Sequence, residues 1–296
     1  MQLRRALDIL GDDGDLAALA DRALAALAQG FGIRHALLLM LDETGGALYT
    51  LASLGYADSG VGAEVMLGEG TIGVAARERI PIRINYRTGD YSYQAAIRAA
   101  NTQEPSIRLP ILSEPHSQIA VPLCHAGQLV GVLYAESEHD ALFNHADEDA
   151  LVVYGRHLTA LMVRPATDGE VPENGLTQAA NTAASMMDAS AAPLVIRYFA
   201  LDHSIFVDND YLIKGVAGSI LWTLLNEHVS NGRRDFCNRE LRRDPRLPLP
   251  DFSDNLETRL ILLQRRLAER CPAIALEKTG RGRFRLNVAR PLQFAR

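Results

Sequence analysis

Between residues 165 and 192 the chain carries few bulky apolar side chains. This segment begins with the letters PATDGEVPENG and continues as an Ala, Ser and Thr stretch that ends at Pro193. Pro, Gly and small polar residues give connections rather than packed cores, so the composition is typical of a linker. The whole chain has 296 residues, a length that suits about two domains. The segment therefore predicts a front domain over residues 1–164, a linker over 165–192 and a back domain over 193–296.

The two predicted domains differ in the sign of their charge. Residues 191–296 hold 18 basic and 12 acidic side chains, which gives a net charge of +6. Residues 1–190 hold 12 basic and 24 acidic side chains, which gives a net charge of −12. An acidic front and a basic back are expected of a regulator with a nucleic-acid-binding end. The alternative is that both charges only solvate two ordinary surfaces.

The sequence also indicates a cellular compartment. No apolar run approaches the ~20 residues that a membrane helix needs, and the first residues lack the apolar stretch of a secretory signal. Cys124, Cys237 and Cys271 are too far apart for a metal knuckle, and three cysteines do not make a disulfide framework. We expect a cytoplasmic protein that does not enter a membrane.

In the front domain, helical and strand patterns alternate. Helical spacing of apolar residues predicts helices over 15–29, 71–79 and 146–163. Short apolar runs predict strands over 36–41, 47–53, 63–67, 82–84, 117–123 and 129–135. Short turn sequences join the first two strands and the last two, so both pairs are predicted hairpins. The pattern predicts an α+β domain in which helices flank an antiparallel sheet.

Three motifs in this domain resemble the GAF domain family. They are a helix start at 68–76 (GEGTIGVAA), a central hairpin at 117–123 (SQIAVPL) and 127–133 (GQLVGVL), and the F-x-x-x-D-E pattern of Phe143, Asp147 and Glu148. Their order makes the resemblance fairly specific, and it covers roughly residues 10–164. It implies a module that senses a small ligand and forms dimers, here a homodimer.

A long insertion between residues 85 and 116 is the candidate ligand site. Long segments inside compact domains often cover pockets, and tyrosines offer rigid stacking faces with polar tips. The candidate ligand-binding residues are Tyr86, Asp90, Tyr91, Tyr93, Arg98 and His116. The alternative is that the tyrosines only pack the insertion onto the sheet.

The sequence does not name the ligand. The pattern of cyclic-nucleotide GAF domains is incomplete because the first lysine is Lys214, and Cys124 lies at a hairpin end, where it is a poor bilin attachment site. A single front-domain cysteine cannot complete the redox cycle of sulfoxide-reducing GAF enzymes. The histidines fit no compact metal signature, so we expect no metal and no enzyme activity. Haem and cyclic nucleotides stay among the candidate ligands, with His116 as the first haem ligand to examine.

The back domain reads as short strands, three helices and a terminal hairpin. The predicted strands are 195–199, 204–207 and 211–213; the predicted helices are 216–232, 238–243 and roughly 253–269; the hairpin is 274–277 with 283–288. This order is typical of a winged helix-turn-helix. Residues 255–267 and the wing 279–286 (TGRGRFRL) resemble the OmpR/PhoB-type effector domain of response regulators, which implies a partner of double-stranded DNA.

Candidate DNA-binding residues follow from that resemblance. Leu256, Leu260, Leu263 and Leu267 form the inner stripe of the third helix, and Asn255, Thr258, Arg259, Arg265 and Arg266 are expected to lie off it, where a helix can read the major groove. The wing contributes Arg281, Arg283 and Arg285, expected to face phosphates or a minor groove. The alternative is that the wing arginines pair with acids on the same sheet.

The sequence therefore predicts a bacterial transcriptional regulator in which a GAF sensor domain controls a DNA-binding winged helix. A second hypothesis belongs to another class: a signalling adaptor whose winged helix binds protein. It rests on Leu262, which is expected to project away from the inner stripe of the third helix.

Overall fold

The computed structural model describes residues 1–11, 15–42, 46–86, 107–163, 192–247, 249 and 256–295. The chain divides into two units, Met1–Val163 and Arg164–Arg296, called here the front unit and the back unit. The predicted linker, up to Ala191, lies outside the described residues. None of the described helices has both the length and the apolar content that crossing a membrane requires.

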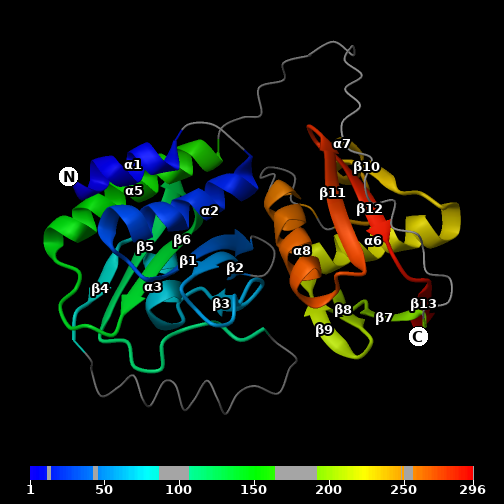
Figure 1. The fold of residues 1–296 in the computed structure, drawn as a ribbon, viewed down its shortest axis with the longest axis horizontal. Helices are drawn as coiled ribbons and strands as arrows, with labels where there is room; N and C mark the ends of the chain where they lie inside the picture. Colours follow the sequence, from blue (N-terminus) through cyan, green and yellow to red (C-terminus); the bar gives the residue numbers. More distant parts are fainter. Residues whose placement is uncertain are drawn as a thin grey trace, which may run out of the picture. The chain divides into compact units, whose positions relative to one another are not determined.

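The front unit is built on a six-stranded antiparallel sheet (Figure 1). Its strands are β1 (His35–Asp42), β2 (Ala47–Leu54), β3 (Glu64–Met66), β4 (Ile82–Ile84), β5 (Ser117–His125) and β6 (Gln128–Ser137). They lie in the order β3-β2-β1-β6-β5-β4. The hairpins β1–β2 and β5–β6 come from sequence neighbours, whereas the central pair β1–β6 joins distant parts of the chain.

Helices cover both faces of this sheet. They are α1 (Gln2–Leu10), α2 (Leu16–Ala26), a π-helical turn η1 (Leu27–Phe31), α3 (Gly70–Glu78) and α5 (His145–Met162). On β5, Ala120 belongs to the core cluster beneath α3, whereas α5 packs through Gly155 against its neighbour Val121. Because successive side chains of a strand point to opposite faces, α3 and α5 lie on opposite sides of the sheet. The predicted α+β architecture of this unit is confirmed.

The sequence analysis missed α1. This helix buries only Ala6 and Leu10 deeply, and Gly30 of η1 lies so close that a side-chain Cβ there would stand 2.7 Å from the Ala6 Cβ. Its apolar residues Leu3, Ala6, Leu7 and Leu10 follow helical spacing, so the sequence does carry a signal for this helix, which the sequence analysis did not use. This apolar side packs closely against η1.

In its described residues, the back unit contains two small sheets and three helices. The strands are β7 (Leu194–Phe199), β8 (Ser204–Val207), β9 (Asp210–Ile213), β10 (Asp235–Cys237), β11 (Ile274–Gly280), β12 (Arg283–Val288) and β13 (Leu292–Ala295), and the helices are α6 (Gly215–Asn231), α7 (Asn238–Arg242) and α8 (Leu256–Arg270). One sheet has the order β13-β7-β8-β9, and the other has the order β10-β12-β11. Strand β13 runs parallel to β7.

Two strands of the back unit were not expected. Strand β10 has three residues, and β13 follows Pro291 without clear alternation, so neither gives a pattern that is legible in sequence. Aromatic packing explains why β13 is held in place. The Phe294 ring lies 4.8 Å from the Trp222 ring, which stacks at 4.6 Å on Tyr198 of β7.

Candidate functional site

A row of polar side chains crosses the ends of strands β1, β6 and β5 on the face of the front sheet that α3 covers. Strand pairing places Glu136 of β6 directly opposite His35 of β1 on one side and Gln118 of β5 on the other. Residues that face each other in antiparallel strands share one face of the sheet. These three residues, called here the polar row, therefore project from the same side as Tyr134, which lies two positions before Glu136.

Glu136 is the most enclosed member of the row, with 1% of its surface exposed. Its Oε1 accepts hydrogen bonds from the Tyr56 hydroxyl at 2.9 Å and from the Leu112 backbone N–H at 2.7 Å. Its Oε2 accepts a hydrogen bond from the Tyr134 hydroxyl at 2.8 Å. All three donors are neutral, and the described residues supply no ion pair to this carboxyl. Within the described part of the chain, this buried acid is therefore held by hydrogen bonds and by no ion pair.

The surroundings of Glu136 determine the direction of its pKa shift. Burial penalises the charged carboxylate and raises the pKa. Hydrogen bonds from Leu112, Tyr134 and Tyr56 stabilise the charged form and lower the pKa, but burial is the larger effect. The carboxyl can therefore carry a proton at a higher pH than an exposed glutamate does, and it can donate as well as accept hydrogen bonds.

The polar row adjoins the start of α3. The Thr71 hydroxyl donates a hydrogen bond of 2.8 Å to Oε1 of Gln118, a side chain that is 4% exposed. The His35 ring lies 5.3 Å from the ring of Tyr56, which also binds Glu136. The GEGTIG motif thus supplies both the helix start and a hydroxyl that reaches the row.

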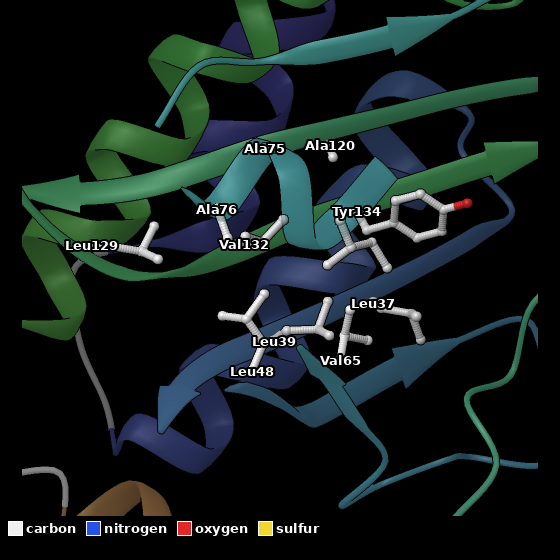
Figure 2. Packing of buried hydrophobic residues seen from close by; sticks show 11 residues of the cluster. Leu37, Leu39, Leu48, Val65, Ala75, Ala76, Ala120, Leu129, Val132 and Tyr134 are labelled. Atoms are coloured by element: carbon white, nitrogen blue, oxygen red, sulfur yellow. The ribbon is translucent and has the colours of Figure 1, made fainter. Parts of the chain in front are cut away.

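An apolar cluster fills the rest of the face beneath α3. Figure 2 shows its members, with the Tyr134 hydroxyl at the edge of the aliphatic side chains. The cluster consists of Leu37, Leu39, Leu48, Val65, Ile72, Ala75, Ala76, Ala120, Leu129, Val132 and Tyr134. This face of the sheet is therefore apolar beneath α3 and polar along the row. Ligand sites commonly combine a mostly apolar lining with a few polar groups in this way.

Two buried polar atoms in the front unit lack a partner. The Thr50 hydroxyl is fully buried and the Asn85 Oδ1 atom is buried, and neither makes a hydrogen bond in the described part of the chain. Thr50 lies opposite Leu39 across β1 and β2, so it shares the face that α3 covers. A buried hydroxyl without a partner costs free energy, and a bound polar molecule or water would remove that cost.

The structure places only two of the residues predicted to bind ligand. Tyr86 is 66% exposed. His116 pairs through Nδ1 with Oδ1 of Asp140 at 3.0 Å, and its backbone N–H donates to the Ser137 carbonyl. Asp90, Tyr91, Tyr93 and Arg98 lie outside the described residues. The ligand-binding role of all six residues stays a prediction.

Sequence reasoning missed Glu136, Gln118 and Tyr56. Glu136 follows directly after the apolar run predicted as a strand at 129–135. The signal that could have found it is its spacing from Val132 and Tyr134, because residues two apart on a strand share a face. A glutamate that continues a buried face is a candidate functional residue.

The thiol and metal chemistry of this unit is limited in the part that the structure describes. Burial raises the pKa of the half-buried Cys124 thiol, and nearby Arg79 opposes that effect. The thiolate, the reactive form, is therefore less populated than in an exposed cysteine. No three His, Cys, Asp or Glu side chains are grouped in a way that could hold a metal ion among the described residues.

In the back unit, the predicted groove-reading surface of α8 is buried. Thr258, Arg259 and Arg266 are between 4% and 6% exposed, so the expectation that they lie off the buried stripe is wrong. Leu262, which was expected to project outward, is 3% exposed. The reason is that α8 packs against α6, α7, β9 and β11, so more than one of its sides is covered.

Arg266 shows how a charged residue is accommodated there. Its Nε donates a hydrogen bond of 3.1 Å to the Leu212 carbonyl, and its Nη1 lies 3.6 Å from Oε2 of Glu269. Burial lowers the pKa of Arg266, although the guanidinium stays charged. Arg265 is partly exposed, and Asn255 lies outside the described residues.

The predicted wing arginines have two different environments. Arg281 and Arg283 are exposed at the β11–β12 turn. Arg285 is also exposed, but its Nε donates a hydrogen bond of 2.8 Å to Oδ1 of Asp235 on the paired strand β10. The alternative of pairing with acids on the same sheet therefore holds for Arg285.

Comparisons with known proteins concern the front unit. The sequence profile of the GAF domain (GAF_2) matches residues 13–163. The GAF domain of a phosphoenolpyruvate-protein phosphotransferase from Acinetobacter is 21% identical, with 54% of this chain and 90% of that chain covered and a TM-score of 0.44. Free methionine-R-sulfoxide reductase from Neisseria meningitidis, in complex with its substrate, is 22% identical. The match covers 54% of this chain and 85% of that chain, with a TM-score of 0.42. No curated protein matches the chain.

Proposed function

The chain belongs to the GAF domain family, and we propose that its front unit binds a small ligand and thereby controls DNA binding by its back unit. GAF domains are sensing modules, so the family supports signal sensing. The observation that carries the ligand site is the polar row beneath α3, with Glu136 held by Tyr56, Tyr134 and the Leu112 N–H. The unpartnered Thr50 hydroxyl on the same face adds a group that a polar ligand would satisfy.

Native mass spectrometry of the full-length protein tests the ligand site. We expect a co-purified small molecule on the wild type and a clear loss of occupancy in Glu136→Ala, which removes the acceptor at the centre of the row. Glu138→Ala is the matched control, because Glu138 is exposed two residues further along the chain. Equal occupancy in both variants would contradict the proposed site.

DNA binding is supported by the order of elements in the back unit. Helix α6, strand β10, helices α7 and α8 and hairpin β11–β12 follow each other in the order typical of a winged helix-turn-helix. The three short strands lie in the order β10-β12-β11. The net charge of +6 over residues 191–296 favours an anionic partner. We propose that this partner is double-stranded DNA and that the protein regulates transcription.

Selection from a pool of random-sequence duplexes tests this part of the proposal. Full-length protein is mixed with the pool, and the retained duplexes are sequenced over successive rounds. A transcriptional regulator is expected to enrich a common site, and a symmetric dimer would enrich two half-sites. If no duplex is retained at low salt, DNA is not the partner.

The adaptor hypothesis has lost the observation that favoured it. It depended on Leu262 being exposed for contact with a partner protein, and Leu262 is buried. Among the described residues, α8 carries no exposed leucine or isoleucine. We therefore propose transcription regulation through DNA binding rather than an adaptor role.

A further inference from the structure

Acids neutralise only some of the arginines at the β10-β12-β11 sheet of the back unit. Arg233 pairs with Glu240, and Arg285 pairs with Asp235. Arg239, Arg281 and Arg283 are different: all three are exposed, and none forms a side-chain hydrogen bond or ion pair with the described residues. These three residues are called here the arginine triad.

Backbone pairing brings the triad together from two parts of the chain. Arg283 opens β12 and lies opposite Cys237 of β10. The next residue after Cys237 is Asn238, whose backbone N–H donates a hydrogen bond of 2.8 Å to the Gly282 carbonyl. Gly282 stands between Arg281 and Arg283, and Arg239 directly follows Asn238. Each of the three arginines is thus next in sequence to one of the two residues that this hydrogen bond joins.

The backbone beneath the triad is anchored in the core. Phe236 of β10 and Phe284 of β12 are buried and stack with their ring centroids 5.9 Å apart. Leu241 of α7 is 3% exposed. The β11–β12 turn adopts a φ of +62° at Gly282, a conformation that glycine accepts without strain. The arginines therefore extend from a fixed base, which reduces the ordering cost of binding.

The charges around the triad favour an anion. The nearest acid along the chain is Glu240 for Arg239 and Glu277 for the turn. Glu240 pairs with Arg233, and Glu277 accepts a hydrogen bond from Asn287 and interacts with Arg285, so neither acid pairs with the triad. A planar guanidinium binds two oxygens of a phosphate at once and keeps its charge at any physiological pH. Because no internal ion pair has to break, all three side chains are available to an external phosphate.

We propose that the arginine triad is the surface of this protein that contacts the phosphate backbone of duplex DNA, and that Arg239 of α7 belongs to it together with the turn. The inference rests on the proposed DNA-binding function and changes which residues contact the DNA backbone. Backbone contacts come from α7 and the β11–β12 turn, whereas Arg259 and Arg266 of α8 make none because they are buried.

Fluorescence anisotropy with the full-length protein and a labelled mixed-sequence duplex tests the triad. Each phosphate contact adds about −0.9 to the slope of log affinity against log salt, so losing one contact costs about eightfold in affinity at about 0.1 M salt. We expect that loss for Arg239→Ala, Arg281→Ala and Arg283→Ala, and about 500-fold for the triple variant. Lysine at each position keeps the charge and should retain most of the affinity.

Two arginines in the same unit serve as controls. Arg270 is exposed at the end of α8 and has no side-chain partner among the described residues; Arg270→Ala should bind within about twofold of wild type, because strand β11 separates it from the turn by about 20 Å. The double variant Arg285→Ala/Asp235→Ala removes one charge of each sign and should also have a small effect, because the two residues neutralise each other.

The outcomes separate the two proposals. If the wild type binds no duplex at low salt, the proposed function fails. If the wild type binds but the triad variants bind as Arg270→Ala does, the triad assignment is overturned while DNA binding stands. Emission of Trp222, which is partly buried against Tyr198 and Phe294, shows whether each variant is folded.

Discussion

At the residue scale, Glu136 has an environment that is unusual for an acidic side chain. Acidic side chains are rarely buried unless paired with a cation, and this one is held by two tyrosine hydroxyls and one backbone N–H. Such a residue destabilises the fold when it is charged, which a protein tolerates most often at a functional site. We therefore regard Glu136 as the centre of the ligand site.

The free energy of unfolding should reveal the protonation of Glu136. Its pKa in the folded protein is raised above the ordinary value of 4.5. The stability that the protonated carboxyl contributes is therefore fully present below pH 4.5 and is lost as pH rises through the folded-state pKa. Glu136→Gln removes this dependence and keeps the hydrogen bonds, since its amide can donate to the Tyr134 oxygen. As pH rises from about 4 to about 8, the variant should therefore gain stability relative to wild type.

Chemical denaturation at several pH values measures this difference. Glu138→Gln, at the exposed neighbouring position, should follow wild type throughout. A constant difference between Glu136→Gln and wild type across the range would show that the carboxyl has the same pKa in the folded and the unfolded protein, and would contradict the raised pKa.

At the scale of elements, two contacts between distant segments complete the fold. In the front unit, η1 and α1 approach so closely that Gly30 leaves no room for a side chain beside Ala6. In the back unit, β13 adds a parallel strand to β7 and brings Phe294 onto Trp222. Both contacts involve elements that the sequence analysis did not find.

Gly30→Val should destabilise the front unit. A Cβ at residue 30 would stand 2.7 Å from the Ala6 Cβ, so α1 would have to move away. Overpacking of this kind costs about 1–3 kcal/mol. Gln29→Val places the same side chain on the exposed neighbouring position and should cost less than about 1 kcal/mol. Equal losses in the two variants, measured by circular dichroism during denaturation, would show that α1 does not pack as described.

Phe294→Ala should loosen the attachment of β13. Phe294 is partly buried against Trp222, so removing its ring should cost about 1–3 kcal/mol, somewhat less than a fully buried phenylalanine. The chain has one tryptophan, and its emission should shift to longer wavelength as its shielding is lost. Gln293→Ala, at the exposed adjacent residue, should leave both stability and emission unchanged.

The sequence predicted most elements but not the site, and the difference has a physical basis. Helices such as α5 and hairpins such as β5–β6 are encoded by local periodicity and turns. The polar row depends on which strands pair and in which register, which local patterns do not determine. The burial of Arg259 on α8 likewise depends on how many elements surround the helix, whereas a helical wheel assumes only one covered face.

At the scale of the whole molecule, the chain joins a GAF unit to a basic unit with a different architecture. We expect the full-length protein to be a homodimer, because a two-fold pair would present two back units to two half-sites. Helix α5 offers an outward side with Val153, which is 49% exposed, and exposed Ala160 one heptad further on. Light scattering at tens of micromolar should give the dimer mass, and Val153→Asp should lower it. A monomeric wild type would contradict this expectation.

The salt dependence of DNA binding by the full-length protein tests the central claim most directly. The account predicts that log affinity for a mixed-sequence duplex falls linearly with log salt, with a slope of about −2.7 or steeper if the three arginines of the triad each neutralise one phosphate. Binding that is absent at about 0.05 M salt, or affinity that does not change with salt, would contradict the claim that the back unit binds DNA through its basic surface.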